Sequence, residues 1–354
     1  MRIRPDMKSL GSRDRNRLAA GLAAAASVVL VAGCGGAGGP GSAPAMTLQT
    51  NPDGTPKLHG EKIRIAVGAA PAVGDARVQL MVNTLNQWGA KASVVNQTGD
   101  PAAVRVVLSG DAEIASIAVP GAISSGLKVF GPSQPRLDYD FVGAPGLKAI
   151  TSLPGKTYGT SNTHGVEALS FSALLSKNKI DPASVTVISS GGAGERVSAM
   201  LAGRLDATFV HADAVRTLMD QGFNDLAKMS EAAPELADSF LSSSTRWLDT
   251  NPALAIAIDE AWIKAAQTFN TDKNAWVAAA TSYSKVDKAE AEANYDALKS
   301  ADTFPAAKSA FSKDSAVAQE KLAAEVGAIK DAPPADKWLT TDAWDKATAA
   351  LGVS

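Results

Sequence analysis

The sequence contains few of the residues that usually form catalytic or metal sites. Its 354 residues include one cysteine and three histidines, so no disulfide can form within one chain, and the sequence holds no His-x-x-His motif and no cysteine cluster of the kind that binds metal. The sequence also lacks a G-x-S-x-G nucleophile motif and an H-E-x-x-H zinc motif. We therefore predict no catalytic residue, no metal site and no cofactor.

Neither sign of charge is in excess. The 34 basic and 36 acidic residues give a formal net charge of −2. Proteins that bind nucleic acid usually carry a clustered basic surface, so we expect no nucleic-acid partner. Hydrophobic residues make up 45% of the chain, which is enough for a sizeable core, and the length alone suggests about two domains.

An uncharged run near the N-terminus is too short to span a membrane. Residues 18–32 carry no charge, whereas a membrane-spanning helix needs about 20 apolar residues. The run follows a basic segment, as in a secretory signal peptide, and it ends at Val31-Ala32-Gly33-Cys34, which resembles the bacterial lipobox. We predict a lipoprotein signal peptide at 1–33 and lipidation at Cys34. The alternative is an apolar N-terminal helix with an incidental cysteine.

The rest of the chain predicts a tether followed by an α/β body. Residues 34–60 are rich in Gly, Pro and Ser, which favours a disordered tether. From Glu61, strand and helix patterns alternate, and this alternation indicates a parallel sheet covered on both faces. Strands are expected at 62–68, 92–95 and 113–119, and helices at 75–88 and 101–108.

The alternation then restarts and gives way to helices. Further strands are expected at 139–143, 156–160, 185–189 and 205–210, with helices at 164–175 and 194–201. Asn251 and Pro252 are typical of a helix start, and the Ala-rich C-terminal third favours helices near 252–269, 272–283, 288–298 and 315–326. We expect this third to pack around the first lobe, with Trp262, Trp276, Trp338 and Trp344 in its core.

Three segments resemble the type II periplasmic solute-binding proteins, most of all the nitrate, sulfonate, taurine and thiamine-pyrimidine receptors of ABC importers. Residues 100–119 are similar to the family's helix, Ser-Gly-Asp turn and strand. SLPGKTYGT at 152–160 and RVSAMLAGRLDATFV at 196–210 are similar to two further family motifs. One departure is Leu153, where the family usually has an Asp-Leu-Lys-Gly-Lys sequence. The resemblance covers about residues 62–219.

The resemblance implies a two-lobed fold whose lobes close around a solute by a hinge motion. It assigns residues 61–119 plus 213–354 to lobe one, with a helical C-terminal part, and residues 120–212 to lobe two. In open α/β sheets, ligands bind outside the C-terminal ends of strands, where helix N-termini point. The predicted ligand-binding residues are therefore in five loops at such ends: Ala70, Val73, Gly74, Val119, Ser161, Asn162, Thr163, His164, Gly191, Gly192, Ala193, His211 and Asp213.

Each of these groups has a structural alternative. Ser161, Asn162 and Thr163 can contact solute oxygens or simply cap a helix. Gly191 and Gly192 allow close approach of a ligand or form a flexible turn. His211 can touch solute or be a satisfied surface histidine, and Asp75, Glu195 and Asp213 suit helix N-termini. None of the five loops contains Arg or Lys, so a neutral, polar or zwitterionic solute is at least as plausible as an anion.

The sequence thus predicts an exported lipoprotein, anchored by lipid on the outer face of the cytoplasmic membrane. It is expected to be a monomer that captures a small organic solute and delivers it to the permease of an ABC importer. The alternatives are a sensor lipoprotein and a receptor of a TRAP-type transporter. An enzyme resembling the thiamine-pyrimidine synthases is disfavoured, because those enzymes depend on a cysteine-rich motif and this chain has one cysteine.

Overall fold

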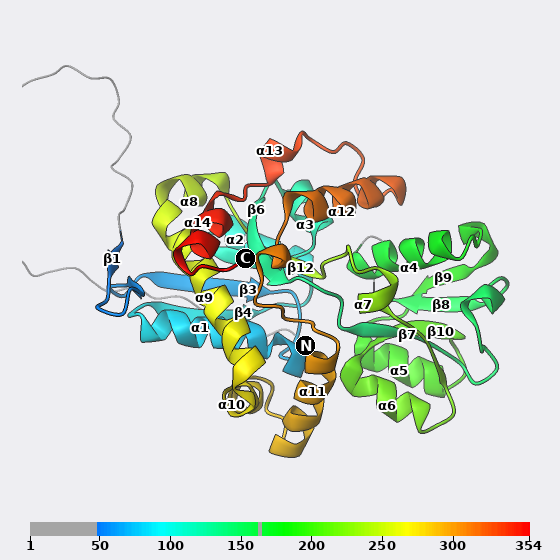
Figure 1. Cartoon of the computed structure of the whole chain (residues 1–354). Helices are drawn as coiled ribbons and strands as arrows, with labels where there is room; N and C mark the ends of the chain where they lie inside the picture. Colours follow the sequence, from blue (N-terminus) through cyan, green and yellow to red (C-terminus); the bar gives the residue numbers. More distant parts are fainter. Residues whose placement is uncertain (1–47, 162–164) are drawn as a thin grey trace, which may run out of the picture. The chain divides into compact units, whose positions relative to one another are not determined.

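Two five-stranded sheets define the two lobes (Figure 1), and a separate two-stranded hairpin precedes them. The computed structural model describes residues 48–161 and 165–354, without the side chains of 212–214 and 217. The predicted signal peptide, Cys34, Asn162, Thr163 and His164 therefore lie outside the described residues. No helix among the described residues is both long and apolar enough to cross a membrane.

The first sheet has the strand order β4-β3-β5-β12-β6. Its interior strand β3 begins with alternating exposed and buried residues and ends in Ile65, Ala66 and Val67, which are all buried, as expected for a strand with both faces covered. β3 runs parallel to β4 and β5, whereas β12 is antiparallel to β5 and β6. The strands are β3 (Lys62–Val67), β4 (Lys91–Asn96), β5 (Ile114–Ile117), β6 (Lys128–Gln134) and β12 (Ser239–Ser243).

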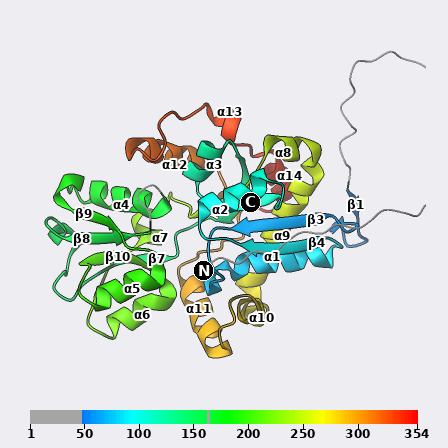
Figure 2. The same ribbon diagram turned by 180° about the vertical axis from the view of Figure 1, so that it is seen from behind.

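Helices from both halves of the sequence cover this sheet. Figure 2 shows α1 lying along β4. The N-terminal helices are η1 (Val73–Asp75), α1 (Ala76–Gln87), α2 (Asp100–Leu108) and α3 (Val119–Ser125). The C-terminal helices are α8 (Thr245–Thr250), α9 (Pro252–Thr271), α10 (Lys273–Ser284), α11 (Lys288–Ser300), η4 (Lys308–Ala310), α12 (Lys313–Glu325), α13 (Ala335–Trp338) and α14 (Asp342–Ala350).

The second sheet has the order β11-β7-β10-β8-β9. In Figure 1, α4 lies on one face of this sheet, and α5 and α6 lie on the other. β8, β9 and β10 are parallel, and β7 is antiparallel to β10 and β11. The strands are β7 (Tyr139–Gly143), β8 (Thr157–Thr160), β9 (Thr186–Ser189), β10 (Ala207–His211) and β11 (Asn224–Lys228). The helices are η2 (Ile150–Ser152), α4 (Val166–Lys177), η3 (Pro182–Ser184), α5 (Ala193–Leu201), α6 (Ala212–Met219) and α7 (Met229–Ala232).

The sheets correct two of the sequence predictions. Both sheets are mixed rather than parallel, because β12 and β7 run against their neighbours. The predicted lobe boundaries are also wrong. β6 belongs to the first sheet although it falls within 120–212, the range predicted for lobe two, and β11 belongs to the second sheet although it falls after 213, in the range predicted for lobe one. The chain therefore passes between the sheets at 135–138 and again at 229–238.

The predicted tether is partly folded. A short hairpin pairs β1 (Gln49–Thr50) with β2 (Pro56–Lys57). The following Leu58 is buried in the first core, and its amide donates to the Trp88 carbonyl over 2.7 Å. The disorder expected for residues 34–60 is therefore wrong from Gln49 onward, because an apolar side chain and backbone hydrogen bonds fix the segment to the turn after α1.

The C-terminal helices pack mainly on the first lobe, as the sequence predicts. Trp262, Trp276, Trp338 and Trp344 are all buried in its core. The Trp262 indole donates to the Ser133 carbonyl in β6 over 3.0 Å. The exception is the end of α12, where Ala323 joins the core of the second lobe. The C-terminal extension therefore touches both lobes.

Candidate ligand-binding site

In each sheet, one set of strand ends lies at the edge where the chain crosses to the other sheet. In the first sheet, β3 and β5 end and the antiparallel β12 begins at the same edge. In the second sheet, β8, β9 and β10 end where β7 begins. The crossing segments 135–138 and 229–238 each link one of these edges to the other. The side chains at both edges therefore lie beside the same two crossing segments.

Arg77 organises the first lobe's side of this region. Its guanidinium is buried and forms an ion pair with Asp75, with Nη2 2.9 Å from Oδ1. It also donates to the Gly74 carbonyl and to Oε1 of Gln134, the last residue of β6. Two donors of this group, Nε of Arg77 and Nε2 of Gln134, have no hydrogen-bond partner among the described residues. Buried donors of this kind require an acceptor.

Asp138 connects the crossing segment to the second lobe. Its Oδ1 lies 2.9 Å from Nδ1 of His211 at the end of β10. Burial acts to raise the pKa of Asp138, but the charges of His211 and Arg77 and the hydrogen bond from His211 outweigh it, and the pKa falls to about 2. A Cβ added to Gly74 would lie 2.9 Å from Oδ2 of Asp138. The 73–75 turn of lobe one therefore approaches the crossing segment closely.

Two further carboxylates lie at the same edge of the first sheet. Asp100, at the start of α2, accepts a hydrogen bond of 3.1 Å from the Ala118 amide. Asp238 immediately precedes β12, and its amide donates to the Gln134 carbonyl over 2.9 Å. Burial raises the pKa of Asp100 to about 6 and that of Asp238 to about 7. For Asp238, the nearby Asp138 carboxylate raises the pKa further.

Buried hydroxyl groups line the adjoining strands. Oγ of Ser116 in β5 lies 2.6 Å from Oγ of Ser133 in β6 and 3.2 Å from Oγ of Ser239 in β12. All three side chains are buried. Serine side chains are mostly exposed in proteins, so three that are buried together give this end of the first sheet a polar interior.

A buried ion pair fixes the loops of the second lobe. Nη2 of Arg196 lies 2.6 Å from Oε1 of Glu167, and Arg196 also donates to the Gly191 carbonyl over 2.9 Å. Oε2 of Glu167 accepts from both the amide and the hydroxyl of Ser161 at 2.9 Å. The pair therefore ties the end of β8, the start of α4 and the turn before α5 into one unit.

The structure brings only some of the predicted residues together. Gly74 and His211 lie at the Asp138 cluster, and Ser161 is bound to Glu167. Val73 and Val119 are buried, whereas Ala70, Gly191 and Gly192 are exposed and Ala193 is half-buried at the start of α5. Asp213 lies in α6, and its side chain is not described.

Sequence reasoning missed Arg77, Asp100, Gln134, Asp138 and Asp238. Asp138 and Asp238 lie in the crossing segments, whose position depends on β6 and β12, two strands absent from the sequence prediction. Arg77 lies inside a helix, and its place in the helical pattern gives no sign that its partner is Gln134 in β6. Asp100 follows Gly99 and precedes Pro101, a helix-start pattern that could have drawn attention to it.

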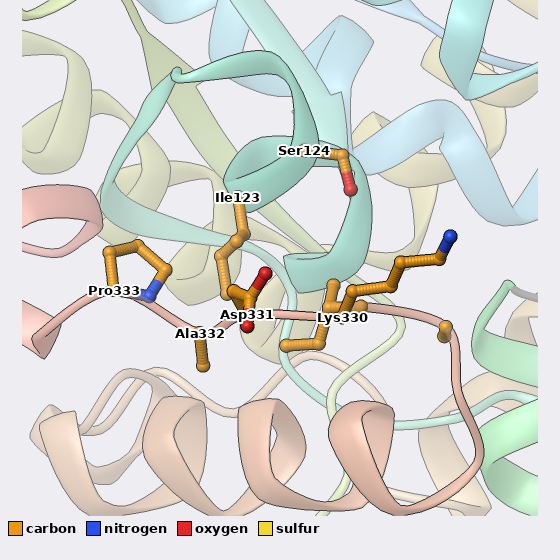
Figure 3. Close-up of a pocket in the computed structure, with 8 residues that line it drawn as sticks. Ile123, Ser124, Lys330, Asp331, Ala332 and Pro333 are labelled. Atoms are coloured by element: carbon orange, nitrogen blue, oxygen red, sulfur yellow. The ribbon is translucent and has the colours of Figure 1, made fainter.

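Two surface pockets are formed by other residues. One, of about 550 Å³, lies between α3 and the segment after α12. Figure 3 shows Ile123 and Ser124 of α3 facing Lys330, Asp331 and Pro333 of that segment. The other, of about 360 Å³, includes Tyr283 and Asn96. Neither is lined by a predicted ligand-binding residue. Among the described residues, no group of three or more His, Cys, Asp or Glu side chains could hold a metal ion.

Comparison with known proteins identifies the fold. Residues 142–272 match the family model described as NMT1/THI5 like, while no curated protein matches the sequence. The ligand-binding component of an ABC-type import system from Staphylococcus aureus, solved with zinc bound, superposes with a TM-score of 0.66 at 16% identity, over 81% of this chain and 99% of that one. The chain has the fold of the solute-binding proteins of ABC importers. The type II periplasmic-binding-protein fold predicted from the sequence is confirmed.

Other proteins with the solute-binding-protein fold differ in activity. The periplasmic aliphatic sulphonate binding protein of Escherichia coli has a TM-score of 0.64 at 13% identity, over 79% of this chain and 92% of that one. The desulfurization enzyme DSZB has a TM-score of 0.58 at 11% identity, over 82% of this chain and 99% of that one. Structures with this fold therefore include binding proteins and an enzyme, and the fold alone does not determine the activity.

Proposed function

We propose that the chain is an exported solute-binding lipoprotein that receives one small organic solute between the strand ends of its two lobes. It would deliver this solute to the membrane permease of an ABC-type importer and act as a monomer anchored through lipid on Cys34. The observation that carries the proposal is the meeting of two polar strand-end edges at the two crossing segments. The shared fold with the S. aureus and E. coli binding proteins supports it.

The crossing segments are suited to act as a hinge. Each is short, and each carries one of the carboxylates of the site, Asp138 or Asp238. A hinge motion needs only a few residues to absorb the change in backbone angles. A solute that touches the edges of both lobes would stabilise the closed arrangement, because it binds that arrangement better than the open one. The lobes on either side of the hinge would then be residues 61–134 plus 239–354 and residues 139–232, which include α7.

Binding can be tested with a mixture of candidate solutes. The purified protein is dialysed against a mixture of small metabolites, and the solutes enriched on the protein are identified by mass spectrometry. We expect one solute per chain, recovered chemically unchanged. Gln134→Ala should weaken its binding at least about tenfold, since loss of one good hydrogen-bonding group costs about 1.5 kcal/mol or more. Gln221→Ala, at an exposed turn, is the matched control and should bind normally.

Two results would contradict this proposal. Enrichment of no solute would speak against binding, and conversion of the solute to a product would indicate an enzyme like DSZB. The anchor is tested separately: Cys34→Ser should move the protein from the membrane fraction to the soluble fraction. A variant that stays in the membrane fraction would refute lipid anchoring.

Cells without the permease separate an importer receptor from a sensor. Loss of solute uptake in those cells would indicate an importer receptor.

A further inference from the structure

The balance of charge at the strand-end edges indicates what kind of solute fits them. We propose that the solute carries a positively charged amine next to a hydrogen-bond acceptor, and that Asp238 and Asp100 receive the amine. The inference rests on the proposed function and narrows it to one chemical class.

Four carboxylates lie at this place, and two of them form ion pairs, Asp75 with Arg77 and Asp138 with His211, each at 2.9 Å. Asp100 is bound by a single backbone amide, and neither Asp100 nor Asp238 forms an ion pair with any residue in the described part of the chain. Asp238 interacts electrostatically with Asp138, Arg77, His211 and Asp100. These contacts place it within the same group.

Gln134 gives an independent sign of a ligand. Its side chain is 4% exposed. Oε1 accepts from Arg77, and its backbone carbonyl accepts from the Asp238 amide, so the carboxamide lies beside both groups. The Gln134 carboxamide is close enough to Asp138 for its hydrogen bonding to lower the pKa of that carboxyl, but Nε2 has no acceptor within the usual hydrogen-bond distance and angle among the described residues, and neither does Nε of Arg77. An unpaired buried donor costs about 1–3 kcal/mol, and an acceptor on the solute would remove this cost.

An anion would fit this edge poorly. A second negative charge about 5 Å from one ionised carboxylate is repelled by about 3 kcal/mol at an effective dielectric constant near 20. The guanidinium that could attract an anion, Arg77, already pairs with Asp75. A metal ion is also disfavoured, because the described residues offer no group of three or more ligands. An ammonium group instead supplies three donors to carboxylate oxygens.

Linkage between solute binding and proton binding predicts whether protons are released or taken up when the solute binds. At pH 6.5, Asp238 and Asp100, whose pKa values are about 7 and about 6, are partly protonated in the free protein. An amine stabilises the ionised carboxylates, so its binding should release up to about one proton per solute. An anion at the same place would require protonated carboxylates and would take up protons. The charged groups facing Asp238 are Asp138, Arg77, His211 and Asp100.

The experiment is calorimetric titration at pH 6.5 in two buffers with different ionisation enthalpies. The probes are ethanolamine, glycine amide and putrescine, the matched anions ethanesulfonate and nitrate, and Zn²⁺. We expect an amine to bind with proton release. Its affinity should fall at least about tenfold in Asp238→Asn and in Asp100→Asn. Asp342→Asn, an exposed carboxylate of α14, should bind as the wild type. Far-UV circular dichroism checks that each variant is folded.

The outcomes separate this inference from the proposed function. Binding of an anion or of Zn²⁺ with no binding of any amine would overturn the inference and leave the solute-binding function standing. Amine binding that is equally strong in Asp238→Asn and Asp100→Asn would overturn the assignment of the site. Failure of every probe, together with no solute enriched by dialysis, would contradict both.

Discussion

Replacing Arg196 with methionine should destabilise the second lobe strongly. Arg196 is 2% exposed and Glu167 is 12% exposed, and their side chains meet at 2.6 Å. The substitution keeps most of the side-chain volume but removes the ion pair and the donors to the Gly191 carbonyl and to Oγ1 of Thr208. Removing one partner of a buried ion pair costs about 3–5 kcal/mol. Glu167 retains its bonds from Ser161 and Thr160, so we expect a cost of about 3 kcal/mol, at the lower end of that range.

The assay must observe the second lobe directly. All six tryptophans lie before β6 or after β12, in the first lobe, so tryptophan fluorescence would report mainly on that lobe. Urea unfolding is therefore followed by far-UV circular dichroism. The matched control is Lys288→Met, which breaks an exposed ion pair with Glu292 and should change the free energy of unfolding by about 0.5 kcal/mol or less.

A double-mutant cycle with Glu167→Gln isolates the pair. The two substitutions together should cost less than the sum of the single costs, with a coupling of at least about 1 kcal/mol, because each single change leaves one buried charge unpaired. Hydrogen exchange should also accelerate at Ser161 and Gly191, the residues that the pair holds in place. The reasoning would be refuted if Arg196→Met cost no more than Lys288→Met.

Three further predictions concern buried carboxylates. Because burial raises the pKa of Asp238 to about 7 from 3.8, its contribution to stability should be full below about pH 4 and lost as the pH rises through 7. The melting temperature of the wild type should therefore be higher at pH 5 than at pH 8, since the free energy of unfolding falls by up to about 3 kcal/mol between these two pH values. Asp238→Asn should reduce the difference. Equal melting temperatures in the wild type would contradict this prediction. Burial opposes ionisation of Asp138, but His211 and Arg77 hold its pKa at about 2. The contribution of Asp138 to the free energy of unfolding is therefore present above about pH 3.8 and lost as the pH falls through 2. Asp138→Asn should abolish that part of acid unfolding. A Cβ on Gly131 would lie 2.0 Å from Oδ1 of Asp259, so Gly131→Ala should lower the free energy of unfolding, measured by chemical denaturation, by about 1–3 kcal/mol. In the background of Asp259→Ala, most of this cost should disappear. An unchanged cost in the double variant would be inconsistent with the contact.

The sequence predicts those helices and strands whose local pattern of apolar and polar residues matches the burial of the side chains in the structure. β7 has the bounds expected from the sequence, Tyr139–Gly143, and α9 starts at Pro252 as expected. β6 escapes the sequence prediction because it contains Gly131 and Pro132, residues that argue against a central strand. It lies at the edge of the first sheet, where a proline is tolerated because one side of the strand needs no hydrogen-bond donor.

The candidate site is less predictable than the fold. The loop positions of Gly74 and His211 follow from the rule that ligands gather at strand ends. The carboxylates Asp138 and Asp238 do not follow from it, because their place depends on which strands pair across a sheet. That pairing joins residues far apart in the sequence, such as Phe240 and Ile117, and no local pattern encodes it.

Hydrogen exchange with and without the bound solute tests the central claim most directly. A molecule held between the strand ends of both lobes should slow exchange in the loops after β3 and β5 and, in the same experiment, in the loops after β9 and β10. Protection limited to one lobe, or found instead at the pocket between α3 and the segment after α12, would contradict the account.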